Sequence, residues 1–311
     1  MRTINPQTYR WITRQQSNPL VLGLLTFGFP LRFVSSIYNA NRERALWGDH
    51  GACVTLSFDC DFPEDVRALP DLLRMLKAYH IRASFACVGA WIEKYPEEHA
   101  KIIEEGHEIV NHTYSHPDNE ILNPGRRFRD IPRDEKREEV ERCHDVCARV
   151  LAYEPKGCRI PHFKHLFTEE IYGILKELGY VYSSSTWLTN TVSHGLPFEA
   201  GDSIVEFPLS VCPRHPFTVF DTWHSLNAKR LSHRLIHRGP EKYVALFRQL
   251  LELGLSTGSY LNVYVDPLDI KKIPDFEAIL EMLSDNRFLL QTYGEYVKNN
   301  LFVEKVDRWR E

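Results

Sequence analysis

The sequence predicts an α/β fold, namely a distorted (β/α)7–8 barrel of parallel strands preceded by an N-terminal arm. From residue 51 onwards, short apolar segments typical of strands alternate with longer segments whose apolar residues recur at helical spacing. Repeated strand–helix units imply parallel strands, and seven or eight of them favour a closed barrel over an open sheet. Chemically active side chains also fall at the carboxyl ends of predicted strands, where barrels of this kind carry their sites.

The elements of this barrel follow one another along residues 51–311. We predict strands at residues 53–58, 83–88, 107–110, 157–160, 181–184, 203–207, 260–265 and 288–291. We predict helices beginning at Pro70 and at residue 168, and helices at residues 96–106, 134–151, 240–253, 276–283 and 293–300. Proline suits the first turn of a helix, as at Pro96, and glycine suits the position after its end, as at Gly106.

The composition is that of an ordinary soluble protein. The 311 residues are 43% hydrophobic, which is enough apolar material for a large core. A net charge of −4 gives no basis for binding nucleic acid. The seven cysteines are odd in number and lie in apolar segments, so we expect buried free thiols and a cytoplasmic location.

Residues 1–50 form the predicted arm, and their apolar run allows two interpretations. Pro19 to Leu31 is flanked by Arg14 and Arg32, but thirteen residues are too few to span a bilayer comfortably. The run could pack on the barrel, or residues 19–34 could lie on a membrane surface. We favour packing because Pro30 and the glycines of the run weaken any amphipathic helix.

Two pairs of polar residues point to a metal site. His112 and His116 are four residues apart, which is one helical turn, so both imidazoles can face the same point. This spacing alone is weak evidence, because such pairs arise by chance. Upstream, Asp59 and Asp61 follow an apolar strand and point to the same side of it. Acid-rich strand ends are common in turns, but the two features together favour a metal site.

These segments resemble the polysaccharide deacetylases, the NodB-homology domain of carbohydrate esterase family 4. The resemblance covers roughly residues 51–300 and is closer in the first half. The matching segments are SFDCD at 57–61, IRASFACVG at 81–89, GHEI at 106–109, HTYSH at 112–116 and RIP at 159–161. The GHEI run followed by HTYSH is a specific signature.

The resemblance implies an enzyme that removes the N-acetyl group from an amino sugar in a polysaccharide or glycoconjugate. It implies a divalent metal, most often zinc, bound by Asp61, His112 and His116. By the same resemblance, Asp59 is the general base. Arg159 would hold that carboxylate in place and keep it ionised, although a plain salt bridge is the simpler alternative.

Two departures from the family pattern concern the general acid. Many members have an aspartate in the segment that here spans residues 182–187, and a histidine in the late strand that here spans residues 260–265. The histidine protonates the leaving amine, and the aspartate tunes it. Asp266 follows the late strand and is our candidate for the acid, provided that its pKa is raised.

An insertion at residues 212–239 has no counterpart in the family pattern. It is rich in cations, histidines and aromatic residues, which is equally compatible with a solvated irregular loop and with a substrate-binding loop. On the second interpretation we expect Trp187 and His224 to contact substrate. His215 and His224 are also rival candidates for the acid.

The altered acid residues keep three functions open. The first is deacetylation of a carbohydrate. The second retains the metal but hydrolyses another amide, such as the formamide of a lipid-linked sugar or a cyclic amide. The third is a metal-containing carbohydrate-binding protein without turnover, which the presence of Asp59 argues against because a binder needs no base.

Overall fold

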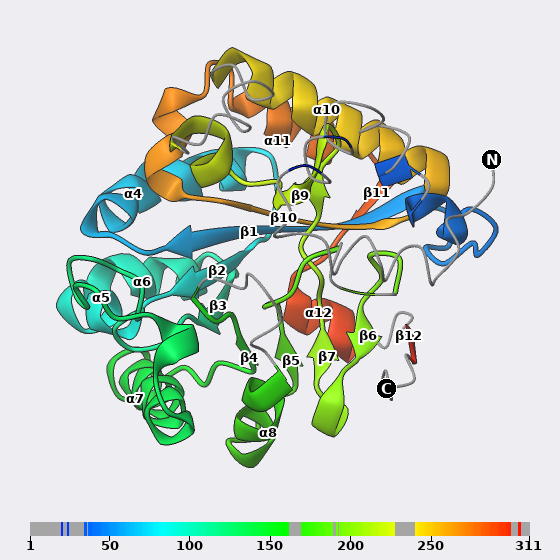
Figure 1. Ribbon diagram of the computed structural model, residues 1–311. Helices are drawn as coiled ribbons and strands as arrows, with labels where there is room; N and C mark the ends of the chain where they lie inside the picture. The colour runs from blue at the N-terminus through cyan, green and yellow to red at the C-terminus, as the bar shows by residue number, and fades with distance from the viewer. Residues whose placement is uncertain are drawn as a thin grey trace.

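The computed structural model describes residues 37–161, 169–188, 193–227 and 240–299, and Leu20, Leu24, Val34, Ser35, Thr191, Glu304 and Lys305 besides. A curled, mainly parallel sheet forms a distorted half-barrel with helices packed around its outer face (Figure 1). The predicted fold class is therefore confirmed. The strand order is β10-β1-β2-β3-β4-β5-β7-β6-β12, and β11 pairs with β1.

The helices and strands agree with most of the predicted segments. The strands are β1 (Ala52–Cys60), β2 (Ser84–Cys87), β3 (Glu108–Asn111), β4 (Gly157–Cys158), β5 (Tyr182–Ser183), β6 (Phe198–Glu199), β7 (Val205–Glu206), β8 (Val211–Cys212), β9 (His215–Val219), β10 (Tyr260–Val265), β11 (Phe288–Leu290) and β12 (Glu304–Lys305). The helices are α4 (Pro63–Ala78), α5 (Gly89–Lys94), α6 (Pro96–Glu104), α7 (Arg133–Leu151), α8 (Glu169–Glu177), α10 (Pro240–Thr257), α11 (Glu277–Leu283) and α12 (Tyr293–Lys298). Short 3-10 or π segments are η1 (Asn39–Asn41), η2 (Phe128–Asp130), η4 (Gly201–Ser203), η5 (Trp223–Asn227) and η6 (Pro267–Lys272).

Strand β1 is the centre of the sheet and is buried along its whole length. It pairs with β10 on one edge, and with β11 and then β2 on the other. Its side chains alternate as a strand requires. Val54, Leu56 and Phe58 join the large apolar core shared with the helices, whereas Cys53 packs with the aromatic side chains of α12. The interior of the barrel is thus lined by the odd-numbered residues of β1.

Two strand pairs depart from the parallel pattern. Strands β6 and β7 are antiparallel, and β8 and β9 form a separate antiparallel pair. Between them, the Ser210 N–H donates to the Asn262 carbonyl at 2.8 Å, which joins the segment after β7 to β10. The segment after β7 is therefore joined to β10, at the other end of the sheet order, by hydrogen bonding at this point and not by a continuous ladder.

The helix predicted to begin at Pro70 begins seven residues earlier, at Pro63, so the predicted start was wrong. Pro63 occupies the first turn, where a backbone N–H would have no partner within the helix, so the missing N–H of proline costs nothing there. The carboxylate of Asp65 accepts the Phe62 N–H at 2.9 Å. Pro70 lies inside α4 on its exposed side. Burial of the leucines on the opposite side offsets the cost of an interior proline.

The described part of the predicted arm packs against the barrel. Tyr38 is fully buried and donates to Ser210, Asn41 donates to Ser259, and Trp47 donates to the Gly258 carbonyl. The division at residue 50 stays a prediction, and most of residues 19–34 lie outside the described residues. Among the residues that are described, no helix has both the length and the apolar character that crossing a bilayer requires.

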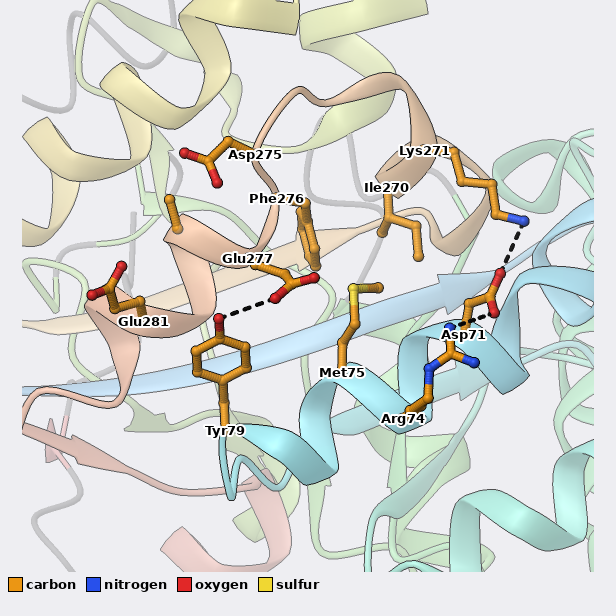
Figure 2. Close-up of a pocket in the computed structure, with 11 residues that line it drawn as sticks. Asp71, Arg74, Met75, Tyr79, Ile270, Lys271, Asp275, Phe276, Glu277 and Glu281 are labelled. Atoms are coloured by element: carbon orange, nitrogen blue, oxygen red, sulfur yellow. Dashed lines mark hydrogen bonds and ion pairs between the residues drawn. The ribbon is translucent and has the colours of Figure 1, made fainter.

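A surface groove runs between α4 and the η6–α11 segment (Figure 2). Its walls are joined by hydrogen bonds and ion pairs, including Tyr79 with Glu277 and Asp71 with Lys271. The lining side chains carry both charges, and none of them comes from the metal site predicted above. These contacts hold α4 against the η6–α11 segment, and the groove is not part of the candidate site.

Candidate metal centre

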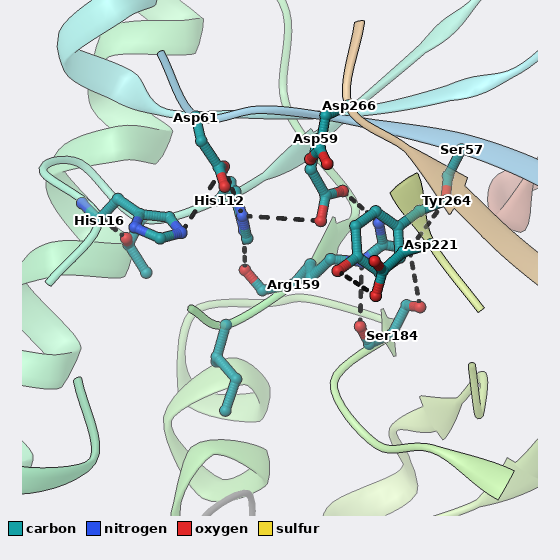
Figure 3. A network of polar contacts seen from close by, with 12 residues as sticks. Ser57, Asp59, Asp61, His112, His116, Arg159, Ser184, Asp221, Tyr264 and Asp266 are labelled. Atoms are coloured by element: carbon teal, nitrogen blue, oxygen red, sulfur yellow. Dashed lines mark hydrogen bonds and ion pairs between the residues drawn. The ribbon is translucent and has the colours of Figure 1, made fainter. Parts of the chain in front are cut away.

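The two aspartates of the first motif lie at the carboxyl end of β1 and point toward the interior of the barrel (Figure 3). Strand alternation explains this direction, because Asp59 and Asp61 continue the odd-numbered series that lines the interior. Asp59 is buried, whereas the side chain of Asp61 keeps 20% of its surface exposed. The sheet thus delivers one enclosed and one accessible carboxylate to the same place.

His112 and His116 lie on the loop that follows β3, so their four-residue spacing is not a turn of helix. Thr113 and His116 both have left-handed backbone conformations, with φ of 64° and 48°. The Asn111 side-chain oxygen accepts the Thr113 N–H at 2.9 Å, and the Thr113 hydroxyl accepts the His116 N–H at 3.2 Å. These local bonds stabilise an unusual turn. This turn, and not helical spacing, brings the two imidazoles together, with their ring centroids 4.8 Å apart.

Asp61, His112 and His116 form a three-ligand set. One ligand atom from each lies within 4.8 Å of the other two. The Asp61 Oδ1 atom is 3.1 Å from His112 Nε2 and 3.6 Å from His116 Nε2. The Arg159 carbonyl lies 2.6 Å from His112 Nδ1, which assigns the proton to Nδ1 and leaves Nε2 to face the site. Two imidazoles and a carboxylate are a donor set that suits zinc and other divalent metals.

The electrostatics of the site agree with this grouping. Burial disfavours protonation of His112, but the Asp61 and Asp59 carboxylates outweigh it and raise the pKa of the imidazole. A site that stabilises an added proton between these groups is also one that stabilises a bound cation. The described residues contain no other group of three such ligands.

Arg159 follows β4 and forms an ion pair with Asp59 in which both side chains are buried. Burial raises the pKa of the Asp59 carboxyl, and the adjacent guanidinium opposes that rise. The remaining guanidinium protons go to neutral oxygens: the Ser184 carbonyl and the hydroxyls of Ser57, Ser184 and Tyr293. Asp59 is the only carboxylate among these partners, so the charge of Arg159 is directed at it.

Asp266 lies at the end of β10 and is buried. Its carboxylate accepts the Thr222 hydroxyl at 2.9 Å, and its own N–H donates to the same hydroxyl oxygen. Burial, with Asp65, Asp61, Asp221 and Asp269 nearby, raises the pKa of Asp266 well above its usual value. A carboxyl group in this environment can carry a proton at a higher pH than an exposed aspartate.

The structure places the predicted substrate residues less favourably. Trp187 is 3% exposed and packs against Leu209, Val219 and Tyr264, so it builds the wall and offers no open face to a sugar. His224 belongs to η5, but its side chain lies outside the described residues. The side chain of His215 also lies outside the described residues. So do four cations of the insertion in their entirety: Lys229, Arg230, Arg234 and Arg238.

The polar residues that hold Arg159 were not among the predicted site residues. Ser57 could have been found, because it lies two residues before Asp59 on the same face of β1. Tyr293 had no such signal: it comes from α12, and its hydroxyl is 2.5 Å from Arg159 Nη2 and 2.6 Å from Asn262 Oδ1. Only the curling of the sheet brings Tyr293 and Asn262 to this position.

Comparison with known proteins agrees with this geometry. Residues 48–183 match the family model of the polysaccharide deacetylases. The resemblance to the polysaccharide deacetylases is therefore confirmed over these residues, which make up somewhat less than half of the chain. Those residues include β1 to β4, the loop of the two histidines and Arg159.

A relative among known proteins supports the same resemblance. A peptidoglycan-N-acetylglucosamine deacetylase of Bacillus cereus is 36% identical over 109 residues, which are 35% of this chain and 36% of the relative. The chain thus aligns with about a third of that protein's length.

Solved structures show the fold. A Mycobacterium smegmatis protein named as a polysaccharide deacetylase superposes with a TM-score of 0.66 at 20% identity, over 85% of this chain and 97% of that one. A carbohydrate esterase family 4 pseudoenzyme of Bacillus anthracis gives 0.50 at 14% identity, over 82% and 67%. The fold therefore accommodates proteins described as inactive, and turnover has to be argued from the site.

Proposed function

We propose that this chain is a metal-dependent hydrolase that removes N-acetyl groups from amino sugars in a polysaccharide or glycoconjugate. The observation that carries the proposal is the buried Asp59–Arg159 ion pair beside the ligand set of Asp61, His112 and His116. A structural or storage site would need the ligands alone. A second carboxylate, 4.0 Å from His112 Nε2 and oriented by its own arginine, is the arrangement that a general base requires.

The chain supplies the proton transfers of amide hydrolysis. A divalent metal held by the three ligands would polarise the amide carbonyl and lower the pKa of a water molecule. Asp59 would accept the proton of the attacking water. Arg159 keeps the Asp59 carboxylate in one orientation and favours its ionised form, which is the form that can act as a base.

The departing amine also needs a proton, because an amide anion is a poor leaving group. Asp266 is the proposed donor, since its raised pKa favours the protonated form. Thr222 contacts both its carboxylate and its N–H and fixes the orientation of the side chain. The side chain of Trp223, which is 45% exposed on the loop that also carries Thr222, offers a surface for a sugar ring.

A product assay with a substrate panel tests the proposal. The purified protein, loaded with Zn²⁺, would be incubated with N-acetylated chitooligosaccharides and peptidoglycan fragments, and released acetate would be measured. Asp59→Asn and a chelated sample are the controls, because each should abolish release for a separate reason. Acetate release that persists in both controls, or no release from any acetylated substrate, contradicts the proposal.

One observation favours a second candidate, hydrolysis of an amide other than an N-acetyl group. The acid position holds Asp266 with an aspartate neighbour, Asp221, whereas the family pattern has a histidine there. The panel therefore includes an N-formyl amino sugar and a cyclic amide. Formate release or ring opening without acetate release would select this candidate.

A further inference from the structure

Each of the three proposed ligands has to be held in place, and the structure holds them differently. His112 is fixed through its ring by the Arg159 carbonyl. His116 is fixed through its backbone by the turn that begins at Asn111. Asp61 is the most exposed of the three, so burial does not determine its position.

The main chain of Asp61 is bound on its N–H side by a buried carboxylate. Asp65 Oδ2 accepts the N–H groups of Asp61 and Phe62 at 3.1 Å and 2.9 Å. Its other oxygen, Oδ1, accepts the Leu268 N–H at 3.0 Å. Asp65 is fully buried, and it connects the end of β1 to the segment that follows Asp266 at the end of β10.

The carbonyl of Asp61 is bound from the opposite side by two donors. The Asn119 side-chain amide donates to it at 2.6 Å, and the Trp91 indole N–H donates at 2.8 Å. The Asn119 N–H in turn donates to the His116 carbonyl at 2.7 Å. The peptide groups on both sides of the Asp61 Cα are therefore held by side chains from α4, α5 and the histidine loop.

We propose that Asp65, Trp91 and Asn119 are positioning residues that hold Asp61 in the geometry needed to bind the metal. The inference rests on the proposed metal site. Fixing both peptide groups of Asp61 fixes its backbone dihedral angles, so its carboxylate reaches His112 and His116 without a search through other conformations.

A helix cap is the ordinary role for a carboxylate in the position of Asp65, and that role alone would account for the Phe62 bond. It does not account for the bond to Leu268. Nor does it account for two further donors that meet on the Asp61 carbonyl from outside α4. The shared target of all three side chains is the metal ligand.

The test measures metal affinity and needs no turnover. Dissociation constants for Zn²⁺ would be measured by competition with a chromophoric chelator for the parent, Asp65→Asn and Asn119→Ala. The visible absorption of bound Co²⁺ would report the ligand geometry. Removing an outer partner of a metal ligand weakens binding about 10–100-fold, so we expect both variants to bind Zn²⁺ about 10-fold more weakly or worse, with an altered Co²⁺ spectrum.

Glu206→Gln is the matched control. Glu206 is also fully buried and accepts two consecutive backbone N–H groups, those of Ser185 and Thr186, but it does not contact Asp61. Its loss should lower stability, measured by urea unfolding in chelator, without changing metal affinity. If Asp65→Asn fails to fold, Asn119→Ala carries the test alone.

The outcomes separate the two proposals. A parent that binds Zn²⁺ while Asp65→Asn or Asn119→Ala binds it equally well overturns the positioning role and leaves the proposed function standing. A parent that binds no divalent metal overturns both. Weaker binding in Glu206→Gln to the same extent would show that the effect is one of general stability, which also overturns the positioning role.

Discussion

Two parts of the candidate site are built from different contacts: the proposed metal-and-base half (Asp59, Asp61, His112, His116 and Arg159) and the proposed acid half (Asp221, Thr222, Tyr264 and Asp266). In the first, a buried guanidinium and two imidazoles face two carboxylates. In the second, carboxylates are contacted by neutral hydroxyls: Thr222 on Asp266 at 2.9 Å and Tyr264 on Asp221 at 3.0 Å.

The difference decides the protonation state that each half favours. Opposite charges in the metal-and-base half stabilise ionised carboxylates, as a base and a metal ligand require. Neutral donors and neighbouring carboxylates in the acid half favour a protonated Asp266. Burial raises the pKa of both Asp59 and Asp266, but only Asp59 has a guanidinium beside it that opposes the rise, which suits the base and acid roles proposed for the two residues.

The largest effect should come from removing the base. Asp59→Asn keeps the shape of the side chain and all three ligands, so Zn²⁺ should still bind. Turnover should fall about 10³-fold or more, since the substitution removes the proposed base. Metal content and product release, measured on the same sample, check this. Retained turnover would show that the two halves do not have the roles assigned to them.

Breaking the ion pair tests the charged character of the metal-and-base half. Arg159→Met should leave Asp59 buried without a counter-charge and lower the free energy of unfolding by about 3–5 kcal/mol at pH 8. Urea unfolding in chelator measures this. Adding Asp59→Asn to the same protein should recover part of the loss. A single variant as stable as the parent would mean that the pair contributes no stability.

Titration tests the acid half. Because burial raises the pKa of Asp266, this residue is protonated at lower pH, and activity should fall as the pH rises through that pKa. Asp266→Asn should remove this alkaline limb and lower the rate about 10–100-fold. Asp266→His should keep part of the activity. An alkaline limb that survives in Asp266→Asn but disappears in His224→Ala would move the acid to the insertion.

The smallest effect concerns acid sensitivity of the fold outside both halves. His107 accepts the Ala83 N–H through Nδ1, and burial lowers its pKa to about 4. Its contribution to stability is complete above pH 6.5 and is lost as the pH falls from 6.5 toward 4, because only the unfolded chain takes up the proton.

Between pH 7.5 and 5, His107→Gln should therefore lose less stability than the parent, by on the order of 1–2 kcal/mol. Urea unfolding of both proteins in chelator at the two pH values checks this. Equal losses would show that His107 does not cause the acid sensitivity of the fold. The His107→Gln variant could then not be used to separate acid effects on activity from acid effects on stability.

What the sequence revealed follows the same division as the site. The metal-and-base half consists of residues close together in the chain, Asp59 with Asp61 and His112 with His116, so short motifs exposed it. Arg159 was found because its position before Ile160 and Pro161 resembles the family. These predictions depended on strand alternation and local spacing, which tertiary packing preserves.

Asp266 was proposed from its place at the end of a predicted strand, but its hydroxyl partner and the support of Arg159 could not be predicted in this way. Thr222 meets Asp266 across 44 residues, and Tyr293 meets Arg159 across 134. A threonine or tyrosine in either segment has no local feature that distinguishes it from a core residue. Burial of Trp187 was missed for the same reason, because its neighbours Val219 and Tyr264 come from distant strands.

The attachment of the N-terminal arm has a consequence for the order of events during synthesis. Tyr38 bonds to Ser210, and Asn41 bonds to Ser259, which are 172 and 218 residues further along the chain. At ribosomal rates of about 5–20 residues per second, the arm leaves the exit tunnel roughly 10–40 seconds before these partners. The buried side chains of Tyr38 and Trp47 lack their final partners during that time. We therefore expect a nascent chain of this protein to bind holding chaperones through the segment around these two residues until residue 259 has emerged.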